Sequence, residues 1–162
     1  MKPSLYTIYT NVISTLQSER DSISDDDFEN QSMKLAAFVI LMHSSMEFFL
    51  SRIIERVARL KLKNFPIAHD KVKGNLTNNK PHFDLFLSIL LPECYENPNI
   101  WRSLEAKRNL CAHGGIFDNS NGGFKLKSEP IYKENIEEFF EYIKDTMEKL
   151  LHAVGNVEKI EV

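Results

Sequence analysis

The chain has 162 residues, of which 43% are hydrophobic and 27% charged, so it is long enough to form one domain with a sizeable core. A formal net charge of −3 excludes a global basic field that would pull the chain onto nucleic acid, and any RNA contact must come from a local patch. Two cysteines, Cys94 and Cys111, are too few for a disulfide framework and lack metal-ligand spacing, so we expect no metal, no cofactor and a reducing, cytoplasmic setting.

The first predicted helix runs from Ser4 to about Arg20, because its apolar residues recur at helical spacing. The segment from Met1 to Thr10 lacks the apolar core of a signal peptide. No apolar run approaches the roughly 20 residues that span a bilayer, so we expect no membrane partner.

The second predicted helix is the longest and covers about residues 26–63. Ser24 and Asp27 are three residues apart, which is the spacing of a capping box that opens a helix. An apolar face follows without an intervening Gly or Pro, which predicts that this helix is the buried spine of the fold. That face comprises Leu35, Val39, Met42, Met46, Phe49, Ile53, Val57 and Leu60.

The middle of the chain is predicted to contain a loose basic loop and two helices. The loop covers residues 64–81, and residues 82–91 form a short apolar helix. The next helix runs from Asn99 to His113, with Gly114 or Gly115 as its natural stop.

The last quarter of the chain contains a strong turn signal at residues 119–123, so residues 116–130 form either a small hairpin or a plain loop. The last predicted helix extends from Ile131 to about Val154, and residues 155–162 are a short tail. The chain is therefore predicted to be an all-α helical bundle of four to five helices with a long second helix, in a single domain over residues 1–162.

The most informative motif is the run Arg108-Asn109-Leu110-Cys111-Ala112-His113, with two glycines after it. Asn109 and His113 are four residues apart and share a helix face, and the long side chain of Arg108 can reach the same region. Arginine offers a planar, permanent cation for phosphate oxygens, and histidine moves protons near neutral pH. This combination suits phosphate chemistry, and Cys111, on another face, is expected to be a small core residue.

The pattern alone supports a structural interpretation equally well, in which Arg108 forms a surface ion pair and His113 caps its helix. An arginine followed closely by a histidine is a loose motif that occurs by chance.

The segment from Trp101 to Gly114 resembles the signature of HEPN domains, which are helical bundles with an R-x4-6-H motif. The stretch Ser45–Leu50 of the long helix is similar to the helix that precedes this motif in the family. Among the subfamilies, the chain most resembles the RiboL-PSP and MAE-type groups.

This resemblance implies a metal-independent endoribonuclease that cleaves single-stranded RNA to 2′,3′-cyclic phosphate and 5′-hydroxyl ends, as a toxin or antiviral abortive-infection effector. It also implies a homodimer in which two motifs meet in one composite active site, and a cognate antitoxin or regulatory protein as a further partner. Carried over by position, Arg108, Asn109 and His113 are the catalytic residues. The alternative that the family offers is an inactive HEPN module that binds a protein or nucleic acid.

Two further groups of residues are candidates for supporting roles. His43 and Glu47 are four apart on the long helix and either support the catalytic residues or form a polar pair within the bundle. A local basic patch is the candidate RNA-binding surface, although an ordinary solvated loop has the same composition. Its residues are Lys61, Lys63, Lys71, Lys73 and Lys107.

Overall fold

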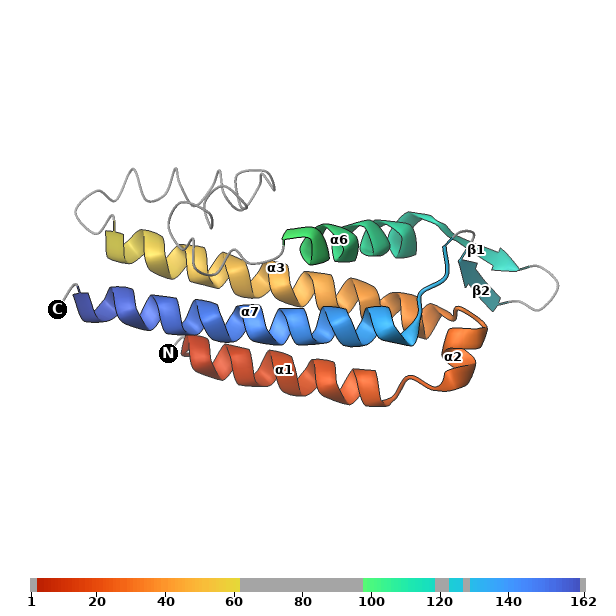
Figure 1. Ribbon diagram of the computed structural model, residues 1–162, viewed down its shortest axis with the longest axis horizontal. Coiled ribbons are helices and arrows are strands. Elements are labelled where there is room, and N and C mark those ends of the chain that lie inside the picture. The colour runs from red at the N-terminus through yellow and green to blue at the C-terminus, as the bar shows by residue number, and fades with distance from the viewer. Residues whose placement is uncertain (1–2, 62–97, 119–122, 127–128, 161–162) are drawn as a thin grey trace. The chain divides into compact units, whose positions relative to one another are not determined.

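The computed structural model describes residues 3–61, 98–118, 123–126 and 129–160. The fold is an all-α helical bundle, as the helical periodicity predicts, with one two-stranded hairpin added (Figure 1). The described residues contain five helices and two strands. The predicted loop 64–81 and the predicted helix 82–91 lie outside the described residues.

The N-terminal half contains three helices, α1 (Leu5–Asp21), α2 (Asp25–Glu29) and α3 (Met33–Lys61). The prediction of one continuous helix over residues 26–63 is wrong at its start, because the chain leaves the helix between α2 and α3. Gln31 there has a φ of 46°, in the left-handed region that breaks a right-handed helix. The Gln31 amide hydrogen bonds to both backbone groups of Ile131, at 2.6 and 2.9 Å, which stabilises this break.

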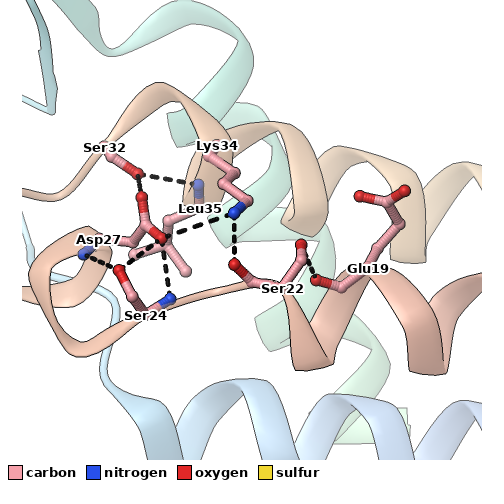
Figure 2. Close-up of polar contacts among 7 residues, drawn as sticks. All are labelled: Glu19, Ser22, Ser24, Asp27, Ser32, Lys34 and Leu35. Carbon is pink, nitrogen blue, oxygen red and sulfur yellow. Dashed lines mark hydrogen bonds and ion pairs between the residues drawn. The ribbon is translucent and has the colours of Figure 1, made fainter.

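The short helix α2 begins with the capping box that the sequence predicts. The Asp27 N–H donates to the Ser24 hydroxyl at 3.4 Å, and the Ser24 N–H donates to the Asp27 carboxylate at 2.8 Å. The same carboxylate accepts from the Ser32 hydroxyl at 2.7 Å, just before α3 starts, and Lys34 lies 4.0 Å away (Figure 2). These bonds, first of all the one from the Ser24 backbone, lower the pKa of Asp27.

The motif helix is α6 (Pro98–His113), and its bounds agree closely with the prediction. Strands β1 (Gly115–Asp118) and β2 (Gly123–Leu126) follow it and pair antiparallel, so this region is a hairpin rather than a plain loop. The register pairs Phe117 with Phe124.

The last helix, α7 (Lys133–Ile160), is longer than predicted. Residues 155–160, predicted as part of a tail, continue the helix. Gly155 lies inside it, where a glycine is tolerated at a modest cost.

The structure divides into two compact units, and each of the long helices α1, α3 and α7 has residues in both of them. Unit 1 comprises Met1–Tyr9, Glu47–Glu96 and Asp145–Val162, and unit 2 comprises Thr10–Met46 and Asn97–Lys144.

In unit 2, Arg20 of α1 connects to the start of α7. Its guanidinium lies 3.4 Å from the Glu137 carboxylate and stacks over the Phe140 ring at 4.1 Å. Two parts of the chain far apart in sequence are thereby held together around an apolar core. The buried apolar residues of unit 2 are Leu16, Leu35, Ala36, Phe38, Val39, Met42, Met46, Leu104, Cys111, Ile131, Ile136, Phe139, Phe140 and Ile143.

In unit 1, Tyr9 of α1 donates its hydroxyl to the Glu148 carboxylate of α7 at 2.6 Å. Burial and this hydrogen bond raise the pKa of Tyr9 to about 12. The buried apolar residues of this unit come from α3 and α7 and are Phe49, Leu50, Ile53, Ile54, Val57, Met147, Leu150, Ala153 and Val154.

The stretch Met33–Val57 of α3 is long and apolar enough to cross a bilayer by length and composition. This differs from the sequence prediction, which counted only uninterrupted apolar runs. Half of the most apolar window of this stretch is buried inside the protein. The core helix of a helical bundle is buried in the same way, and such helices also pass this test of length and composition.

Candidate active site on the last turns of α6

The three predicted catalytic residues all lie on the last two turns of α6, in unit 2. Asn109 and His113 are exposed, and Arg108 is half-buried. His113 is the last residue of the helix. The helical repeat places Asn109 and His113 one above the other, so an amide and an imidazole face solvent on the same side of α6.

Arg108 is held by its neighbour in the sequence. One of its terminal nitrogens donates to the side-chain oxygen of Asn109 at 2.8 Å. A guanidinium has five N–H donors, so this bond orients the group and leaves donors for a further acceptor such as a phosphate. The structure thus brings Arg108 and Asn109 together, and among the described residues neither side chain makes a hydrogen bond to His113.

The chain after His113 is held tightly by Gly114. The Gly114 N–H donates to the Leu110 carbonyl at 2.6 Å and closes the last turn of α6. A Cβ on Gly114 would lie 2.7 Å from that oxygen, so only glycine fits without a shift. Gly114 therefore allows the backbone to pass close to the last turn of α6 directly after His113.

Lys107, predicted as an RNA contact, lies among the described residues with an ion-pair partner. Its ammonium is 3.2 Å from the Glu129 carboxylate, and its side chain is only 15% exposed. A phosphate at this lysine would have to compete with Glu129. No local sequence pattern predicts Glu129 as the partner of Lys107, because the two residues are 22 positions apart.

Cys111 lies on the buried side of α6 and is 5% exposed. Burial raises the pKa of its thiol to about 11, although nearby Lys107 acts in the opposite direction. A thiol with this pKa is protonated at neutral pH and is a poor nucleophile.

His43 is fully buried and stacks on Trp101 of α6, with ring centroids 4.7 Å apart and planes 13° apart. Its ring therefore packs against the first turn of the motif helix. Glu47 belongs to unit 1, whereas the motif belongs to unit 2. The supporting roles predicted for His43 and Glu47 stay predictions.

Most of the predicted basic patch is not described. Lys63, Lys71 and Lys73 lie outside the described residues, and for Lys61 only the helical backbone is described. Within the described residues, no group of three or more His, Cys, Asp or Glu side chains is arranged to hold a metal ion.

No family model, no curated protein and no solved structure matches this chain.

Proposed function

We propose that the chain is a metal-independent endoribonuclease of the HEPN type that acts on single-stranded RNA in toxin or antiviral defence. The observation that carries this proposal is the set of guanidinium, amide and imidazole groups on the last two turns of α6. Asn109 and His113 are exposed there, and Arg108 is oriented by its 2.8 Å bond to Asn109. The resemblance of the surrounding sequence to the HEPN signature supports the same function.

In the proposed reaction the ribose 2′-oxygen attacks the adjacent phosphorus and the bond from phosphorus to the 5′-oxygen breaks. His113 accepts the 2′-hydroxyl proton or donates a proton to the leaving 5′-oxygen. Arg108 stabilises the negative charge that builds up on the phosphorane oxygens. The products are a 2′,3′-cyclic phosphate and a 5′-hydroxyl, and no oxidant or metal enters the balance.

Asn109 has two roles in this proposal. Its oxygen positions the Arg108 guanidinium, and its amide N–H groups remain donors for a phosphate oxygen. One protomer supplies a single His113, whereas the reaction needs both a base and an acid. We therefore propose a homodimer with a two-fold axis that brings two copies of the motif together.

The test is cleavage of a labelled single-stranded RNA in the presence of EDTA. We expect His113→Ala and Arg108→Ala each to lower the cleavage rate at least about a hundredfold. The matched controls are His152→Ala, an exposed histidine on α7, and Arg102→Ala, an exposed arginine on α6. Both controls should cleave at the wild-type rate.

Cleavage that persists in the His113 and Arg108 variants would remove these residues from the mechanism. A well-folded wild-type protein that binds RNA or copurifies with a protein partner, but does not cleave, would instead identify an inactive binding module. Each variant is checked by urea unfolding, so that loss of activity is distinguished from loss of fold.

A further inference from the structure

Unit 1 contains a cavity of about 660 Å³ that plays no part in the proposed ribonuclease function. Helices α1, α3 and α7 all contribute to its lining, which is mainly apolar and includes Leu5, Ile8, Phe48 and Leu151. Its volume lies within the range of about 300–1,000 Å³ that is typical of small-molecule sites. The volume and the apolar lining of this cavity are both suitable for the apolar part of a small ligand.

Two large aromatic side chains at this cavity are exposed. Phe48 is 46% exposed and Tyr6 is 67% exposed, and both belong to the lining. Aromatic surface left in contact with water in a concave site is a common feature of binding surfaces. A bound apolar chain would remove part of this surface from water, which is a favourable contribution to binding.

The charged groups of the cavity determine which ligand it prefers. Arg52 and Arg56 outnumber the single carboxylate, Glu55, so the lining carries one net positive charge. Glu55 is 8% exposed and accepts from Arg52 at 3.1 Å. The Arg52 guanidinium also lies over the Phe48 ring, 5.2 Å from its centroid.

Arg52 is therefore positioned before any ligand arrives. Glu55 engages one of its terminal nitrogens, and Phe48 supports the plane of the group. The Arg52 side chain is still 41% exposed, and a guanidinium has five N–H donors. Its remaining donors match the two oxygens of a carboxylate, which arginine binds with two parallel hydrogen bonds.

We propose that this cavity binds an amphipathic anion, a long-chain carboxylate. Its apolar chain lies against Leu5, Phe48 and Leu151, and its head group is held by Arg52. This cavity shares no residue with the motif on α6. A negative result for the ribonuclease proposal would therefore leave the ligand proposal untouched, and the reverse is also true.

The experiment is isothermal titration of the full chain with dodecanoate at a concentration below micelle formation. Dodecanol and acetate serve as matched ligands, because the first has the chain without the charge and the second has the charge without the chain. We expect saturable binding of dodecanoate, binding of dodecanol about tenfold weaker, and no binding of acetate. Far-UV circular dichroism confirms that the protein stays folded during the titration.

Two variants test the residues. Arg52→Gln should weaken dodecanoate binding at least about tenfold and leave dodecanol binding unchanged, because only the charged head loses its partner. Phe48→Ala, which removes an aromatic ring that is 46% exposed, should weaken the binding of both ligands about equally. The controls Arg102→Gln and Tyr132→Ala, which replace an exposed arginine and an exposed tyrosine outside the cavity, should bind like the wild type.

Several results would overturn the proposal. One is the absence of dodecanoate binding to the wild type, and another is equal binding of dodecanoate and dodecanol. Dodecanoate binding that Arg52→Gln and Phe48→Ala leave intact would place the ligand elsewhere. Binding to anionic phospholipid vesicles without binding of free dodecanoate would indicate a membrane-surface interaction instead of this site.

Discussion

Gly114 is the position at which the structure makes its sharpest prediction about stability. A Cβ there would lie 2.7 Å from the Leu110 carbonyl oxygen, which is 0.7 Å closer than the 3.4 Å at which ordinary contact begins. The oxygen cannot retreat freely, because it accepts the Gly114 N–H at 2.6 Å. Gly114→Ala must therefore move backbone, and such overpacking costs about 2 kcal/mol.

The matched control is Gly155→Ala on α7, where an added Cβ would meet nothing within 4 Å. Alanine inside a helix is more favourable than glycine by about 0.5–1 kcal/mol, so this variant should be more stable than the wild type. The same substitution is thus expected to have opposite signs at the two sites.

Urea unfolding followed by circular dichroism measures both effects. With a slope of about 2 kcal/mol per molar urea, Gly114→Ala should lower the midpoint by about 1 M, and Gly155→Ala should raise it by a few tenths. If His113 is catalytic, the RNA cleavage rate of Gly114→Ala should also fall far below that of Gly155→Ala. The reason is that a displacement of about 1 Å at a reacting group can lower a reaction rate about a hundredfold. A Gly114→Ala protein as stable as Gly155→Ala would refute the account of this junction.

Two further predictions follow from the pKa shifts of Asp27 and Cys111. Because the folded-state pKa of Asp27 lies below its usual value, its carboxylate stabilises the fold above that usual pKa and loses this effect as the pH falls through the lowered one. Asp27→Asn should therefore cost about 1–2 kcal/mol at neutral pH by urea unfolding, and its difference from the wild type should disappear in acid. The control is Asp26→Asn in the same turn, which removes no side-chain hydrogen bond among the described residues and should cost much less at neutral pH. In a Cys94→Ser background, iodoacetamide should alkylate Cys111 about a hundredfold more slowly in the folded chain than in urea at pH 8, because burial raises the thiol pKa to about 11. Cys111→Ala should retain RNA cleavage, and an alkylation rate equal in the two states would show that this thiol is not buried.

Local sequence signals predicted the elements whose structure depends on neighbouring residues. The apolar repeat predicted α1 and the buried face of α3, and the glycines after His113 predicted the end of α6. The three-residue spacing of Ser24 and Asp27 predicted the start of α2. These features depend on interactions within a few residues, which a single sequence displays directly.

The errors occurred where distant contacts decide the structure. The break between α2 and α3 contains neither Gly nor Pro, and it depends on the hydrogen bonds that Gln31 makes with Ile131, a hundred residues later. The predicted last helix ends at about Val154, yet the helix continues through Gly155, because an isolated glycine costs too little to stop a helix that is otherwise well packed.

The candidate site shows the same difference between features that depend on neighbouring residues and features that depend on distant ones. Arg108, Asn109 and His113 are close in sequence, so their common helix face was predictable. The ion pair of Lys107 with Glu129 and the stack of His43 on Trp101 join separate elements, and so does the cavity lined by α1, α3 and α7. No spacing rule within one element could identify these contacts.

We propose that the residues on the last turns of α6 cleave RNA through its 2′-hydroxyl. The most direct measurement compares one oligonucleotide in its RNA form and its all-deoxy form, incubated in EDTA with the wild type and with His113→Ala. We predict that the wild type converts only the RNA form, to fragments with 2′,3′-cyclic phosphate ends, and that the variant leaves both forms intact. Cleavage of the deoxy form, or fragments with 5′-phosphate ends, would contradict the proposed mechanism.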